Sequence, residues 1–170
     1  MKEKGITPTD LVARYARGPA LLEKAVSGLA ESDYDLAEST GGWTIRQYVH
    51  HTADADELWK VFLKRALGNS GGKFDLWWYV QAPEQEYWAQ AWMYASRSIA
   101  PSLALFRANR ATITQLLRAV PGALDKCLNY CYKDGRVESV SVREIIEMQT
   151  FHAEEHVGNI RHILAARQGS

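Results

Sequence analysis

The chain has 170 residues, 46% of them hydrophobic, which is enough for one domain with a buried core spanning residues 1–170. Its 20 basic and 20 acidic side chains cancel, which argues against a nucleic-acid partner because phosphate binding needs excess Lys and Arg. No apolar stretch approaches the roughly 18 residues that span a bilayer, and no secretory signal is visible. We expect a cytoplasmic protein with no membrane partner, in which Cys127 and Cys131 stay reduced.

Apolar residues at helical spacing predict four long helices. The first covers residues 8 to about 31, and the second follows a capping box at Thr44 and runs to about 67. The third opens near Pro101, which suits a first helical position, and continues to about 120. The last begins at a second capping box, at Ser141, and ends near 167. The fold class predicted is therefore all-α, a four-helix bundle.

Two segments between these helices are irregular. Aromatic side chains crowd residues 73–96, and a short extra helix is predicted over 83–94. They fill the core or a subunit interface, or they wall a pocket that binds an apolar substrate. Asp134-Gly135, at the centre of residues 127–139, predicts a small hairpin or an extended excursion. If the aromatic residues wall a pocket, Tyr130 and Tyr132 are expected to reach its mouth. The aromatic residues of the first segment are Phe74, Trp77, Trp78, Tyr79, Tyr87, Trp88, Trp92 and Tyr94.

Three histidines carry the chemical prediction. His152 and His156 are one turn apart on the apolar stripe of the last helix, where imidazole is costly to bury unless something binds it. On the second helix the same periodicity turns His51 toward the core and leaves its neighbour His50 at the rim or exposed. Three imidazoles with a water molecule are a familiar catalytic zinc arrangement. The alternative is a bundle whose core histidines are hydrogen-bonded and bind no metal.

Other polar residues have candidate roles around this site. Asp54 is placed to orient an imidazole, and Glu155 is the candidate catalytic general base, although its flanking position also suits a solvated residue. Arg46 and Arg161 are candidates to hold a carboxylate, although surface solvation is the preferred interpretation for both. Residues 152–156 match the H-x-x-E-H pattern of inverted zinc proteases, but the 14 residues that follow contain no acidic third ligand.

Residues 42–54 and 152–160 resemble the DinB/YfiT-like superfamily of metalloenzymes, especially its YfiT-type branch of metal-dependent hydrolases. In that family a tryptophan begins the second helix and a metal-binding histidine follows eight positions later. Counting from Trp43 leads to His51, the residue that helical periodicity also selects. The family's last helix carries an H-x-x-x-H pair, which here is His152 and His156.

The resemblance implies a bundle with up-down-down-up topology and a long crossover, often assembled as a homodimer. It implies a nickel or zinc ion held by three histidines and water, and some relatives also use a low-molecular-weight thiol. The expected function is activation of water or a thiol for hydrolysis or S-transfer on a small-molecule substrate. The alternative is a non-catalytic small-ligand-binding or stress-response module with a vestigial metal site.

Overall fold

A computed structural model describes residues 6–38, 41–75 and 84–168. Its helices and strands follow the predicted order, with a 3-10 turn at Glu31–Asp35 and another at Ala123–Asp125. The helices are α1 (Pro8–Ala16), α2 (Gly18–Val26), α3 (Ile45–Gly68), α4 (Glu84–Ala91), α5 (Ala100–Ala119) and α6 (Val142–Gln168). The strands are β1 (Gly72–Asp75), β2 (Cys127–Cys131) and β3 (Val137–Ser141).

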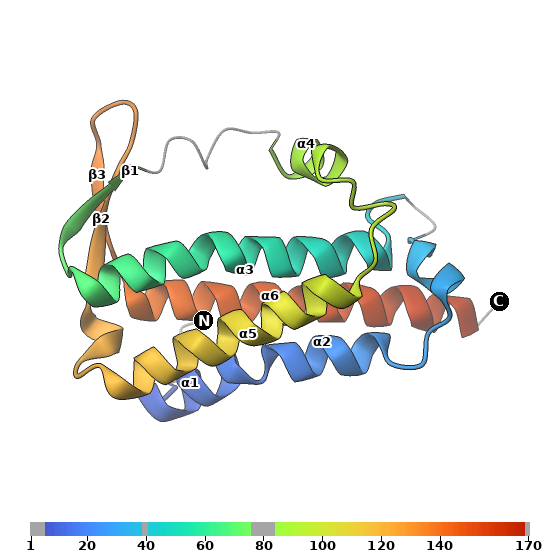
Figure 1. Cartoon of the computed structure of the whole chain (residues 1–170), viewed down its shortest axis with the longest axis horizontal. Coiled ribbons are helices and arrows are strands. Elements are labelled where there is room, and N and C mark those ends of the chain that lie inside the picture. Colours follow the sequence, from blue (N-terminus) through green and yellow to red (C-terminus); the bar gives the residue numbers. More distant parts are fainter. Residues whose placement is uncertain (1–5, 39–40, 76–83, 169–170) are drawn as a thin grey trace.

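The long helices form a four-helix bundle in which α1 and α2 together make the first rod (Figure 1). Figure 1 shows α3 and α5 running in the same direction, with α1–α2 and α6 running the opposite way. Two successive helices can be parallel only if the chain returns along the bundle, and the connection that contains β1 and α4 makes this return. The predicted up-down-down-up bundle is confirmed. None of the helices in the described parts of the chain is both long and apolar enough to cross a membrane.

The first rod is interrupted, whereas the sequence predicted one helix over residues 8–31. The interruption falls at Arg17, between α1 and α2, and α2 ends at Val26. Pro19 has no N–H to donate to the carbonyl of Tyr15 four residues earlier, so the helical ladder loses a bond there. The adjacent Gly18 lies so close to α5 that a Cβ would sit 3.3 Å from the ring of Phe106. The break therefore combines a missing donor with close packing between rods.

A small sheet closes one end of the bundle. The predicted hairpin is confirmed, because β2 pairs antiparallel with β3 across a turn in which Gly135 has a φ of 85°. The strand β1 was not predicted, and it pairs parallel with β2, more than fifty residues away in the sequence. Contrary to prediction, Tyr130 faces the core at this end, with its ring 5.2 Å from that of Phe62. Tyr132 donates a hydrogen bond to Glu138 within the hairpin.

The aromatic residues of the crossover have mixed roles. Phe74 packs on Phe62 with ring centroids 4.0 Å apart, and Tyr94 is also buried. Trp88 and Trp92 stack on each other, while Tyr87 is exposed. Trp77, Trp78 and Tyr79 lie outside the described residues. Burial in the core thus accounts for two of the described rings. Cys127 and Cys131 are free thiols, as expected.

A polar layer centred on Arg110 separates two apolar core clusters. One cluster surrounds Phe62 and Ile113 near the sheet, and the other surrounds Val49 and Phe106 near the opposite end. The guanidinium of Arg110 lies between them and is 1% exposed. A buried charge is costly unless it is paired and hydrogen-bonded, so its partners determine whether this layer stabilises the bundle.

Those partners come from every other rod of the bundle. Arg110 on α5 donates through Nε to Asp56 of α3 at 2.6 Å and through Nη2 to the carbonyl of Gln149 on α6 at 2.9 Å. Its Nη1 donates to the carbonyl of Tyr15 in α1 at 3.2 Å, the acceptor that Pro19 cannot reach. The guanidinium also lies 3.8 Å from the centroid of the Tyr15 ring. One side chain therefore joins all four rods.

Replacement of Arg110 by methionine is expected to lower the free energy of unfolding by about 3–5 kcal/mol, because it leaves the carboxylate of Asp56 buried without its cation. Urea unfolding followed by circular dichroism measures this loss. The exposed Arg118 on the same helix is the matched control, and Arg118→Met should change stability by no more than about 0.5 kcal/mol.

The double variant Arg110→Met/Asp56→Leu should recover part of the stability, since it removes both charges. If Arg110→Met lowered the free energy of unfolding as little as the control Arg118→Met, a central role for this ion pair would be contradicted.

Candidate metal centre

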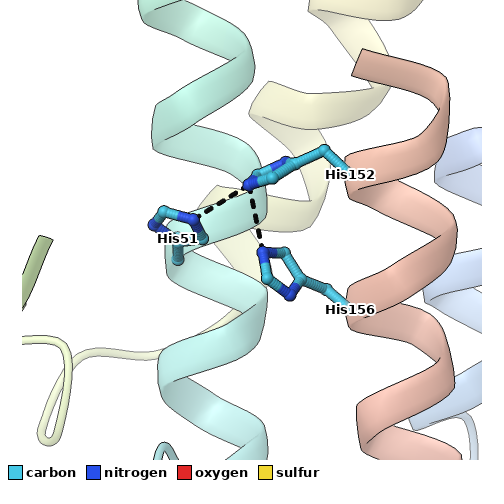
Figure 2. A group of neighbouring side chains, drawn as sticks. All are labelled: His51, His152 and His156. Carbon is cyan, nitrogen blue, oxygen red and sulfur yellow. Dashed lines mark hydrogen bonds between the residues drawn. The ribbon is translucent and has the colours of Figure 1, made fainter. Parts of the chain in front are cut away.

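The three predicted histidines meet between α3 and α6. Figure 2 shows the rings of His51, from α3, and of His152 and His156, from α6, directed toward one another. The Nε2 atom of His152 lies 3.0 Å from Nε2 of His51 and 3.0 Å from Nε2 of His156. His51 is 8% exposed, and the other two rings are half-buried. Two helices distant in sequence thus direct three nitrogen atoms at one point.

Hydrogen bonding alone does not satisfy this arrangement. A neutral imidazole nitrogen is either a donor or an acceptor with a single lone pair. If Nε2 of His152 is bare, it must accept from both neighbours with one lone pair, and if it carries a proton, it can serve only one of them well. Nδ1 of His156 is buried and has no hydrogen-bond partner among the described residues. The cluster therefore has the chemistry of a ligand set more than that of a hydrogen-bonded core.

Protonation of the rings is strongly disfavoured. Burial lowers the pKa of His51 to about 3, with a further contribution from the charge of His156. Burial also lowers the pKa of His156 to about 4 and that of His152 to about 2, where charge on the other two rings and on Arg110 adds to the effect. At neutral pH the three rings are uncharged, which is the form that binds a metal.

The spacing of the nitrogen atoms fits one divalent cation. Imidazole nitrogens bound at 2.0–2.1 Å to a tetrahedral zinc ion lie about 3.3 Å apart, so the contacts of the cluster are within a few tenths of an ångström of that value. The ligand atoms of all three rings lie within 4.8 Å of one another. His51, His152 and His156 form the ligand group found within residues 6–38, 41–75 and 84–168.

The prediction for His50 was wrong, because this side chain is completely buried. Its Nε2–H donates to the carbonyl of Arg97 at 3.2 Å, so its Nδ1 accepts from the hydroxyl of Ser102 at 2.8 Å. The ring of Tyr94 lies 5.4 Å away. Helical periodicity predicted one buried face for α3, but α3 packs against both α5 and α6. His50 lies in the interface with α5, where it meets Ser102, whereas His51 faces α6.

The other predicted polar residues have different positions. Asp54 forms an ion pair with Arg97 at 3.3 Å and so acts on His50 indirectly, not on His51. Arg46 is buried and pairs with Glu31 and Asp35, which corrects the preference for surface solvation. This pairing anchors the segment before α3.

Glu155 and Arg161 are exposed. Glu155 is separate from the group of three ligands, and its role as a base stays a prediction.

Two aromatic residues beside the cluster were not assigned to it from sequence alone. The ring of Trp43 lies 4.6 Å from that of His51, and the ring of Tyr48 lies 5.2 Å from that of His156. Tyr48 comes one turn before His51 and Thr52 on α3, and this spacing was the available signal. The buried pair of Asp56 and Arg110 was also missed. A charged residue beside an apolar stripe does not reveal which of many opposite charges it meets.

Curated relatives share most of the chain. A protein of Bacillus subtilis named "Putative metal-dependent hydrolase YfiT" is 29% identical over 151 residues, covering 89% of this chain and 80% of the relative. A protein of Oceanobacillus iheyensis with the same description is 27% identical over 143 residues, covering 84% of this chain and 77% of the relative. These homologues are named for metal-dependent hydrolysis, and the three-histidine cluster agrees with that description.

Solved structures show the same fold. YfiT from Bacillus subtilis, which has an unusual four-helix bundle topology, matches with a TM-score of 0.79 at 21% identity. The match covers 99% of this chain and 93% of that one. A mycothiol-dependent maleylpyruvate isomerase matches with a TM-score of 0.65 at 15% identity, covering 91% of this chain and 61% of that one.

The family model of the DinB superfamily matches residues 14–160, which include both segments that carry the histidines. YfiT-type homologues extend the likeness over most of the chain. Because the family model matches most of the chain, this chain belongs to the DinB superfamily.

Proposed function

We propose that this protein is a metal-dependent hydrolase of small molecules, in which His51, His152 and His156 hold a nickel or zinc ion. The observation that carries the proposal is the approach of three Nε2 atoms from two separate helices, two of the contacts at 3.0 Å. The names of the homologues support hydrolysis. Nickel and zinc both accept imidazole ligands, so the residue types favour neither.

The number of protein ligands supports a catalytic site. A structural zinc site is closed by four protein side chains, whereas catalytic sites use three and leave a position for water or substrate. The described residues supply three ligands here. A bound divalent cation would lower the pKa of a coordinated water or thiol toward neutrality. The neutral rings hold the cation without cancelling its charge, and Glu155, three residues after His152, is the proposed acceptor of the released proton.

A thiol-dependent transfer is the second candidate function. It has support from the shared fold of the mycothiol-dependent isomerase. The position that three histidine ligands leave open on a metal ion can take a thiolate in place of water. In that case a low-molecular-weight thiol is a second substrate. The two candidates differ in whether thiol is consumed together with the electrophile.

His51→Ala and His156→Ala are each expected to abolish stoichiometric metal binding, because each removes one of three ligands. Elemental analysis after loading with nickel or zinc and gel filtration measures the metal content. The unmodified protein should hold about one equivalent and should melt at a higher temperature when loaded, since a ligand that binds only the folded state stabilises it. The exposed His162 on α6 is the matched control, and His162→Ala should retain the metal. A metal content below about 0.2 equivalents in the unmodified protein would overturn the proposal.

The metal-free protein is expected to lose stability as the pH falls from about 6.5 to about 4. Histidines of the unfolded chain take up protons below their ordinary pKa of 6.5, whereas burial holds the folded values at about 3 for His51 and about 4 for His156. Each such ring contributes a slope of up to about 1.4 kcal/mol per pH unit. Denaturant unfolding at several pH values measures the slope.

In this experiment His51→Gln should reduce the slope, and His162→Ala should leave it unchanged. If the stability of the metal-free protein were independent of pH over this interval, the histidines would have their ordinary pKa in the folded protein, and the prediction would be wrong.

Activity should depend on the metal and should separate the two candidate functions. Chelation is expected to remove hydrolysis of small activated esters, and re-addition of nickel or zinc should restore it. Parallel measurements of ester cleavage and free thiol distinguish hydrolysis from thiol transfer. If metal-loaded protein is silent with esters and with thiol–electrophile pairs, a non-catalytic binding module is the better description.

A further inference from the structure

A pocket that the proposed function does not use lies at the sheet end of the bundle. It forms where α1 begins, α5 ends and α6 begins, and Figure 1 shows these ends together beside the sheet. Its volume is about 420 Å³, within the range of pockets that bind small molecules. We call it the sheet-end pocket, and its walls include Val12, Leu117, Leu124, Arg118 and Arg143.

The floor of the sheet-end pocket is a surface of the core. Val12, Leu117, Ala123 and Leu124 belong to the apolar cluster beside the sheet, and each side chain is between 4% and 9% exposed. The core meets solvent across this opening, and contact between apolar surface and water is unfavourable. A ligand with an apolar chain would cover the four side chains and displace that water.

Among the described residues, the rim of the pocket carries two guanidinium groups and one carboxylate. Arg118 comes from α5, Arg143 from α6 and Asp125 from the 3-10 turn between them. Within the described parts of the chain, the Arg118 guanidinium has no ion-pair, hydrogen-bond or cation–π partner. Arg143 pairs with Glu147 at 3.7 Å, which is longer than a hydrogen bond. Because guanidinium groups form paired hydrogen bonds with carboxylates, an anionic head group suits this rim.

The position of Arg143 does not favour the helix that carries it. Arg143 is in the first turn of α6, where the helix dipole disfavours a cation. Its partner Glu147 comes four residues later, and an ion pair at this spacing is weaker when the basic residue comes first. Residues that local energetics disfavour are expected at functional sites. Binding of an anion at the sheet-end pocket would account for a cation at this point.

We infer that the sheet-end pocket binds a monocarboxylate with an apolar chain, such as a medium-chain fatty acid. The chain would cover the apolar floor, and the carboxylate would bind between Arg118 and Arg143. Asp125 would repel a second negative charge, so a dicarboxylate would bind less well. None of the three histidines lines the pocket, so this inference goes beyond the proposed function and does not depend on it.

Titration of the metal-free protein with octanoate and with octanol tests the sheet-end pocket. The two ligands share an apolar chain, and only octanoate is charged. Metal-free protein is used because a bound metal ion would also take a carboxylate. Two-dimensional amide NMR spectra measure both the affinity and the location of each ligand. Octanoate should bind about ten-fold more tightly, since hydrogen bonds to charged groups are stronger than neutral ones. Its shifts should centre on Val12, Leu117 and Leu124.

Substitutions on the rim and in the wall separate the two parts of the ligand. Arg118→Gln and Arg143→Gln should each lower the affinity for octanoate about three-fold and leave that for octanol unchanged. Arg107, exposed on α5 and paired with Glu23, is the matched control, and Arg107→Gln should change neither affinity. Ala13 is exposed and lines the pocket, so the larger side chain in Ala13→Leu should weaken both ligands.

Several outcomes would overturn the inference. Equal affinities for octanoate and octanol, or tighter binding of octylammonium, would show that the rim does not select an anion. Shifts centred on His51 and His152 would place the ligand elsewhere. A loss in Arg107→Gln as large as that in Arg118→Gln would mean that general electrostatic attraction produces the preference. Both arginines are exposed, so these variants are expected to fold, and circular dichroism spectra verify it.

Discussion

The position of Arg110 is the constraint on which the arrangement of this bundle depends. Its guanidinium donates to Asp56 of α3, to the Gln149 carbonyl of α6 and to the Tyr15 carbonyl of α1. A cation buried between two apolar clusters has little freedom, because displacement of any rod leaves a buried charge or carbonyl unpaired. Since His51 lies on α3 and His152 on α6, the same contacts hold the two helices of the metal centre in register.

Burial of the histidine cluster contributes little to the stability of the metal-free protein. Three imidazoles are removed from water, and their nitrogen atoms compete for one lone pair at His152. Their lowered pKa values show the same cost, because each ring is kept uncharged below the pH at which it would ordinarily take up a proton. A cation at this point would satisfy all three nitrogen atoms. Metal binding therefore explains why three imidazoles are buried together, whereas stability of the fold does not.

The chain belongs to the DinB superfamily and shares the fold of YfiT from Bacillus subtilis, and its histidine cluster has aromatic neighbours. Trp43 and Tyr48 extend the ring system beyond the ligands. Neither aromatic residue belongs to the group of three ligands.

The amino-acid sequence by itself determined α3, α5 and α6, the capping boxes of α3 and α6, and the inward direction of His51, His152 and His156, because these follow from local hydrogen bonding and helical periodicity. It failed for His50 because periodicity assumes one buried face, and α3 is covered on two sides, by α5 and α6. Only the tertiary structure decided which acid Arg110 meets, that β1 pairs with β2, and that Tyr48 packs beside His156. Those contacts join residues far apart in the chain, and local spacing does not specify such partners.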